Sequence, residues 1–263
     1  MNGRPAPRAT VFVDADNTLW ETDSVFAAAQ LNLLEGVETL LNRKASAADR
    51  LAFVRSVDQR LAQKHHDGLR YPPRLLVRGI AIALDGMGAE RAVKAAWLGS
   101  ASSPLPEARE AEVERNFFGD IATLPEPRPG VLEGLDALQD AGCLVLVVTE
   151  AASRKTEEIA AKLGMADHFD RVVEGRKRPA LYQRIVRLAG TPDRSFMVGD
   201  QLDRDIAPAK AAGLETIYYP GNFKPRWQLD EDAGAPDHRI SSFAEVPGIV
   251  LAPSRVARVA GRR

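Results

Sequence analysis

The segment Val11-Phe12-Val13-Asp14-Ala15-Asp16-Asn17-Thr18-Leu19 places two carboxylates directly after an apolar run that predicts a buried strand. Residues i and i+2 of an extended segment point the same way, so Asp14 and Asp16 can converge where the strand ends. Oxygen ligands of this kind suit Mg²⁺, and one carboxylate could then attack phosphorus while the other transfers a proton. A strand that runs into a turn rich in Asp and Asn explains the same residues without catalysis.

The composition is that of a globular chain with balanced charge. The 263 residues are 45% hydrophobic, and 35 basic against 36 acidic residues leave a net charge of −1. This balance gives no general attraction to nucleic acid or to an anionic membrane, so neither is expected as a partner. Cys143 is the single cysteine, which excludes an intramolecular disulfide. No apolar leader and no membrane-length apolar stretch is found, and we expect a cytoplasmic location.

Residues 23 to about 120 show helical periodicity throughout. Asp23 is available as the N-cap of a first helix, Ser46 with Asp49 predicts a second start, and Pro72-Pro73 opens a third helix. Two shorter helices are expected at residues 89–98 and 107–118. The sequence therefore predicts an all-helical block that ends at a proline-rich return, residues 125–130.

After that return, helices and strands alternate. Strands are expected at residues 144–148, 169–173, 195–198 and 216–219, with an edge strand at 239–241, and helices at 131–141, 153–163, 180–189 and 205–212. Such alternation predicts an α/β fold with a parallel sheet and helices on both faces, and ligands of such sheets bind at the carboxyl ends of the strands. The first strand belongs to this sheet, so the helical block is an insertion.

Four segments in order resemble the motifs of the haloacid dehalogenase-like (HAD) superfamily. They are Asp14-Ala15-Asp16-Asn17-Thr18, the strand Leu144–Thr149, the lysine of Gly175-Arg176-Lys177-Arg178-Pro179, and Phe196–Asp205. The resemblance implies a Rossmann-like, HAD-like core with a helical cap inserted after the first motif. It divides the chain into a discontinuous core (1–22 and 124–252), a cap (23–123) and a basic C-terminal tail (253–263).

The resemblance also implies a role for each motif residue. Asp14 is expected as the nucleophile that forms an aspartyl-phosphate, and Asp16 as the general acid and then base. Thr149 would bind a phosphoryl oxygen, and Lys177 would neutralise the charge of the transferring group. The Mg²⁺ ligands implied are Asp14, Asp16 through its backbone carbonyl, Asp200 and, in support, Asp205 or Asp203.

Several positions depart from the family pattern. Asn17 stands where glycine is more usual, but Asn tolerates a left-handed turn. Glu150 follows the hydroxyl of Thr149 and is a candidate substrate-binding residue, although a carboxylate there would repel a phosphate unless it points away. The base of the third motif is either Lys177 or Arg178. Lys177 is favoured because Lys177-Arg178-Pro179-Ala180-Leu181-Tyr182 resembles the Lys-x-Pro-x-x-Tyr variant of that motif.

The basic bias of the helical block suggests further substrate contacts. Arg70 and Arg74 flank a predicted turn, and we expect them to bind the part of the substrate beyond its phosphoryl group. Most other basic residues there are expected to be solvated.

The leading functional hypothesis is a Mg²⁺-dependent phosphatase that hydrolyses a small phosphorylated metabolite. A dehalogenase is disfavoured because those relatives lack a carboxylate at the position of Asp16. Two alternatives stay open, a phosphomutase of the same family and a catalytically silent protein that regulates or binds a partner. Neither the substrate nor the oligomeric state can be deduced from the sequence.

Overall fold

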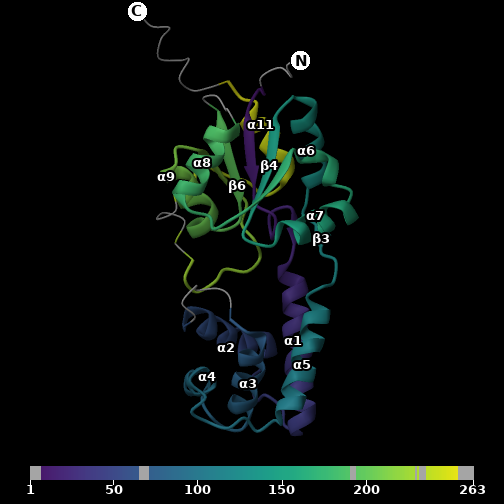
Figure 1. The fold of residues 1–263 in the computed structure, drawn as a ribbon, viewed down its shortest axis with the longest axis vertical. Helices are drawn as coiled ribbons and strands as arrows, with labels where there is room; N and C mark the ends of the chain where they lie inside the picture. The colour runs from purple at the N-terminus through teal and green to yellow at the C-terminus, as the bar shows by residue number, and fades with distance from the viewer. Residues whose placement is uncertain (1–6, 65–70, 190–193, 229, 231–234, 254–263) are drawn as a thin grey trace, which may run out of the picture. The chain divides into compact units, whose positions relative to one another are not determined.

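The computed structural model describes residues 7–64, 71–189, 194–228, 230 and 235–253 (Figure 1). Contacts between Cα atoms divide the chain into two units. The first comprises Met1–Thr22, Pro125–Lys224 and Gln228–Arg263, and the second comprises Asp23–Leu124 and Pro225–Trp227. In the part of the chain that the structure describes, no helix combines the length and the apolar character needed to cross a membrane.

The first unit is built on a six-stranded parallel sheet, which confirms the predicted fold class. The strand order is β5-β4-β1-β6-β7-β8. The strands are β1 (Thr10–Val13), β4 (Leu144–Thr149), β5 (Arg171–Glu174), β6 (Ser195–Gly199), β7 (Glu215–Tyr218) and β8 (His238–Arg239). The first strand is thus central, although more than a hundred residues separate it from its neighbour β4.

Alternating side chains of the central strands bury two separate cores, as period-2 geometry requires. Val11 and Val13 face one core, in which α6 (Val131–Asp140), α7 (Ser153–Lys162) and α11 (Val246–Val250) bury their apolar residues. Phe12 faces the other core, with α8 (Pro179–Ala189) and α9 (Ala207–Ala211). The helices therefore cover both faces of the sheet (Figure 1).

In the part of the second unit that the structure describes, five helices are inserted after the first strand and share a hydrophobic core of their own. They are α1 (Asp23–Leu41), α2 (Arg50–Lys64), α3 (Pro73–Leu84), α4 (Ala89–Leu98) and α5 (Glu107–Asp120). The start of α2 corrects one detail of the sequence analysis. Asp49 rather than Ser46 precedes the helix, and its Oδ1 accepts a hydrogen bond from the N–H of Ala52 at 2.9 Å.

The chain leaves the first unit and returns to it through two short antiparallel strands. Strand β2 (Trp20–Glu21) pairs with β3 (Glu126–Pro127). We call this pair the linker ribbon. The sequence analysis did not predict it, because two-residue strands carry no periodic pattern.

Among its described residues, the first unit also contains three short helical segments, namely η1 (Ala166–His168), η2 (Leu202–Ile206) and η3 (Phe243–Glu245). The strand expected at 169–173 begins at Arg171, because Phe169 still belongs to the turn that closes η1 and its N–H donates to the carbonyl of Ala166. Segment η2 is a π-helix where an α-helix starting at Asp205 was expected. Its wider turn directs both the N–H of Asp205 and that of Ile206 to the carbonyl of Gln201.

Candidate active site

The predicted motif residues lie at the carboxyl ends of adjacent strands. Asp14 follows β1, and its N–H donates to the carbonyl of Val198 in β6 at 2.9 Å. Thr149 ends β4, and Asp200 follows β6 directly. All three side chains are buried, with exposed fractions of 5%, 2% and 5% for Asp14, Thr149 and Asp200. Because β4, β1 and β6 are neighbours, their ends bring residues 14, 149 and 200 to one edge of the sheet.

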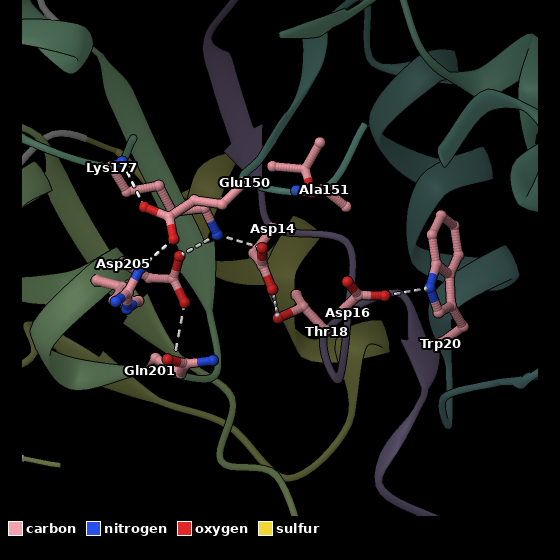
Figure 2. A network of polar contacts seen from close by, with 11 residues as sticks. Asp14, Asp16, Thr18, Trp20, Glu150, Ala151, Lys177, Gln201 and Asp205 are labelled. Atoms are coloured by element: carbon pink, nitrogen blue, oxygen red, sulfur yellow. Dashed lines mark hydrogen bonds and ion pairs between the residues drawn. The ribbon is translucent and has the colours of Figure 1, made fainter. Parts of the chain in front are cut away.

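A buried lysine joins two of the carboxylates (Figure 2). The Nζ atom of Lys177 contacts Oδ1 of Asp14 and lies 2.6 Å from Oδ1 of Asp205. The hydroxyl of Thr18 donates to the other oxygen of Asp14, Oδ2, at 3.1 Å. Asp14 is therefore held at both oxygens, and its carboxylate is fixed where β1 ends.

For both Asp14 and Lys177, burial and the neighbouring opposite charge shift the pKa in opposite directions. Burial raises the pKa of Asp14 to about 7, against the lowering effect of the Lys177 ammonium, while Asp205 adds to the rise. Burial also disfavours the charged form of Lys177, but the carboxylates of Asp14 and Asp205 outweigh it and hold the pKa of the lysine well above its ordinary value. Lys177 is thus a fixed cation beside Asp14.

Three of the predicted metal ligands form one acidic cluster. Asp14, Asp200 and Asp205 each present one carboxylate oxygen, and these oxygens lie within 4.8 Å of one another. Three buried carboxylates beside one lysine leave an excess of negative charge, and hard oxygen donors fit a cation such as Mg²⁺. The residues present therefore fit the metal that the sequence predicts. Asp203 is not part of this cluster.

The local backbone explains how Asp205 reaches the cluster. Its Oδ2 accepts the N–H of Gln201 at 3.0 Å, and its Oδ1 binds Lys177. A Cβ atom added to Gly199 would overlap the side chain of Asp205, so only glycine fits at the end of β6.

The turn after β1 holds Asp16 beside the cluster. Asn17 has a φ of 57°, a left-handed conformation that asparagine tolerates. The indole Nε1–H of Trp20 donates to Oδ1 of Asp16 at 3.0 Å. The side chain of Asp16 is not among the three clustered carboxylates. Its expected role as a metal ligand through its backbone carbonyl stays a prediction.

The carboxylate of Glu150 is occupied within the protein. Its Oε1 accepts the backbone N–H of Lys177 at 3.0 Å, and its Oε2 forms an ion pair with Arg204. A free carboxylate at this position would repel a phosphate. Arg204 compensates that charge, and Glu150 at the same time fixes the backbone of Lys177.

The remaining predicted residues lie elsewhere or are already paired. Arg178 is exposed, whereas Lys177 is buried in the cluster. Arg70 lies outside the described residues. In the helical unit, the guanidinium of Arg74 binds Glu114 with an N–O distance of 2.6 Å and also approaches Glu107. Its predicted contact with a substrate stays a prediction.

Sequence reasoning missed four residues that organise this site, namely Thr18, Trp20, Gln201 and Arg204. Each was part of a recognised segment or adjoined one. Thr18 lies four residues after Asp14, so a turn between them could have indicated that the Thr18 hydroxyl reaches the Asp14 carboxylate. The contacts of Trp20 and Arg204 depend on the turn and on the π-helix, which local patterns do not reveal.

The fold and the cluster define an α/β enzyme with a buried lysine and an acidic centre that fits a divalent cation. Comparison with known proteins identifies the family. The haloacid dehalogenase-like hydrolase family matches residues 9–213, which is most of the chain. The chain belongs to this family, and the resemblance drawn from the four motifs is confirmed.

Relatives of known name are consistent with this assignment. The chain is 27% identical over 176 residues to a phosphoglycolate phosphatase from Nitrosococcus oceani, covering 63% of this chain and 77% of that protein. It is 29% identical over 133 residues to a ribulose-1,5-bisphosphate 5-phosphatase from Halopiger xanaduensis, covering 46% of this chain and 56% of that protein. The predicted class of HAD-type phosphomonoester hydrolase agrees with both relatives.

A solved structure shares the fold. It is a protein described as a HAD-hydrolase, YfnB from Bacillus subtilis, bound to magnesium. The two chains superpose with a TM-score of 0.59 at 17% identity, over 93% of this chain and 99% of that one.

Proposed function

We propose that this protein is a Mg²⁺-dependent phosphatase that hydrolyses a small phosphorylated metabolite through an aspartyl-phosphate. The observation that carries the proposal is the buried carboxylate of Asp14, held by Lys177 and Thr18 inside an acidic cluster. A nucleophile, a fixed cation and a set of metal ligands thus meet at the edge of the sheet where neighbouring strands end. This combination suits phosphoryl transfer, in which charge must be neutralised and the reactants aligned.

The metal would be held by Asp14, Asp200 and Asp205, with the backbone carbonyl of Asp16 as a further ligand. When bound, Mg²⁺ supplies positive charge that polarises the phosphoryl group and relieves repulsion between the substrate and the carboxylates. The family membership and the donor set support this assignment.

Each catalytic side chain has a distinct task in the proposed reaction. An oxygen of Asp14 attacks phosphorus, a phosphorus–oxygen bond to the leaving group breaks, and Asp16 gives its proton to the departing oxygen. Asp16 then takes a proton from a water molecule that attacks the aspartyl-phosphate, which releases inorganic phosphate and restores Asp14. Lys177 neutralises charge on the transferring phosphoryl group, and the hydroxyl of Thr149 donates to one of its oxygens.

The substrate class rests on the relatives and on the residues of the helical unit. Both named relatives act on small phosphorylated compounds, as their names state. Arg70 and Arg74 stay our candidates for binding the remainder of the substrate. A phosphomutase would use the same Asp14 and Asp16, but it would return the phosphoryl group to a sugar and release little inorganic phosphate.

The test is release of inorganic phosphate from p-nitrophenyl phosphate and from a panel of phosphorylated metabolites. We expect turnover with Mg²⁺, loss of turnover on chelation, and loss of roughly three orders of magnitude or more in Asp14→Asn. Asp167→Asn is the matched control, because Asp167 is an exposed carboxylate of the same unit. Near-wild-type turnover in Asp14→Asn, or equal activity without a divalent cation, would contradict the proposal.

A further inference from the structure

The turn that carries Asp16 is contacted by Trp20 of the linker ribbon and by Arg128, the residue that follows the ribbon's second strand. Trp20, in β2, is fully buried and donates its indole N–H to Oδ1 of Asp16 (Figure 2). The carbonyl of the same Trp20 accepts the N–H of Asn17 at 2.7 Å. One residue of the ribbon therefore binds two consecutive residues of the turn.

The second strand contributes through Arg128, which follows β3. Its N–H donates to the carbonyl of Leu19 at 3.0 Å, so it extends the pairing of the two strands. Its guanidinium donates to the carbonyls of Asn17, Tyr219 (3.1 Å) and Pro220 (2.8 Å). The guanidinium carbon also lies 3.4 Å from the centre of the Tyr219 ring.

These contacts fix a strained backbone position. Asn17 adopts the left-handed conformation, which costs free energy unless neighbouring groups hold it. Its carbonyl is held by Arg128, its N–H by Trp20, and its side-chain Oδ1 accepts both the N–H and the hydroxyl of Thr22 at 2.9 Å. The direction in which Asp16 points is thus determined by contacts of the neighbouring Asn17 with Trp20, Arg128 and Thr22.

We propose that Trp20 and Arg128 are positioning residues that orient Asp16 and determine which of its oxygens carries the proton. The proposal rests on the proposed function, in which Asp16 is the general acid and base. An indole N–H is a donor only, so Oδ1 of Asp16 must accept from Trp20 in both protonation states. The proton that Asp16 gives to the leaving group therefore sits on Oδ2, and the same oxygen accepts the proton of the attacking water. Arg128 keeps the turn that carries Asp16 in place through the carbonyl of Asn17.

The kinetic test compares two substrates of nearly the same shape. p-Nitrophenyl phosphate has a good leaving group that needs little protonation, whereas phenyl phosphate has a poorer one and depends on the general acid. We expect Trp20→Phe, which removes the N–H donor and keeps an aromatic ring, to lower kcat/KM about tenfold or more for phenyl phosphate and about threefold or less for p-nitrophenyl phosphate. Arg128→Lys, which keeps the charge but not the planar fork, is expected to show the same bias.

The control is Trp97→Phe, because Trp97 lies in α4 of the helical unit and is 37% exposed. It should leave both substrates unaffected. Equal losses on the two substrates in Trp20→Phe would show a general structural defect and would overturn the proposal. If wild-type protein hydrolyses neither ester with Mg²⁺, the proposed function fails, and the contact must be judged by a separate measurement.

That measurement is the ¹H–¹⁵N spectrum of the three tryptophan indoles in the full chain. Asp16→Ala removes the acceptor, so the indole signal that Trp20→Phe identifies should shift, while those of Trp97 and Trp227 stay in place. This measurement tests the contact between Trp20 and Asp16 without any turnover. If Trp20→Phe does not fold, the signals of Trp97 and Trp227 can be assigned from their own variants, and the remaining signal is that of Trp20. An unshifted Trp20 signal would overturn the proposal.

Discussion

Glu150 shows how a residue that departs from a family pattern is accommodated. It binds the backbone of Lys177 and pairs with Arg204, so the two charges nearly cancel beside the proposed phosphoryl site. Both side chains are about a quarter exposed. A neutral pair of this kind neither repels nor attracts a phosphorylated substrate strongly. Removal of one partner exposes the charge of the other.

Glu150→Gln is therefore expected to lower KM for p-nitrophenyl phosphate. The amide keeps an oxygen for the N–H of Lys177, but Arg204 becomes an uncompensated cation near an anionic substrate. At an effective dielectric constant of about 20, the gain is on the order of 1 kcal/mol, or about fivefold in KM.

Steady-state kinetics at low and at high salt check this prediction, because added salt should reduce the difference. Glu157→Gln is the control, since Glu157 is exposed on α7. An unchanged or raised KM in Glu150→Gln would show that the ion pair does not influence substrate binding.

At the site, the residues that lie within a sequence motif could be predicted from the sequence. Asp14, Lys177 and Asp205 were predicted because each lies at the end of an apolar run or at a fixed spacing within a motif. The residues that position these side chains were not predicted. Thr18, Trp20 and Arg204 act through contacts that exist only once the turn, the ribbon and the π-helix have formed.

At the scale of the element, long periodic segments were predictable and short ones were not. The five helices of the insertion start within a few residues of their expected positions, because each has an apolar face that repeats over several turns. Strand β2 and the π-helix η2 are stabilised by distant partners instead. Segment η3, which leads into α11, had a signal that was overlooked, since Ser242 and Glu245 form a capping box at its start.

One buried carboxylate joins the first two helices of the insertion. The side chain of Glu38, in α1, accepts the N–H of Ala45 at 2.8 Å and binds Lys44 (3.1 Å) and Arg50 (2.9 Å). Burial alone would raise the pKa of Glu38, but these hydrogen bonds outweigh it and hold the pKa below its ordinary value. The ionised carboxylate therefore stabilises the folded insertion.

We expect Glu38→Gln to lower the free energy of unfolding by about 2 kcal/mol at neutral pH. Because the folded pKa lies below the unfolded one, this contribution is fully present above about pH 4.3, the ordinary pKa of glutamate, and is lost as the pH falls through the folded value. Urea unfolding of wild type and variant across this range, followed by circular dichroism, measures the difference.

The control for this experiment is Glu35→Gln, since Glu35 lies one turn earlier in α1 and is exposed. Its stability should match wild type at every pH. A Glu38→Gln difference that grows on acidification would contradict the assigned sign of the pKa shift.

At the scale of the whole molecule, the chain crosses between its two units four times, after Thr22, after Leu124 and on either side of Pro225–Trp227. The four motifs and the acidic cluster lie within the first unit, while the insertion has its own hydrophobic core. This division agrees with the family, in which the motifs supply the chemistry of the reaction. We propose that the insertion binds the part of the substrate beyond the phosphoryl group.

In the proposed reaction, Asp14 becomes phosphorylated during turnover. Protein mixed with substrate and Mg²⁺, quenched in acid within the first turnovers and examined by mass spectrometry, should carry one phosphoryl group on Asp14. The modified fraction should increase in Asp16→Asn, because the base that activates the hydrolytic water is lost, and it should vanish in Asp14→Asn. A phosphoryl group on another residue, or turnover by Asp14→Asn at the wild-type rate, would contradict the account.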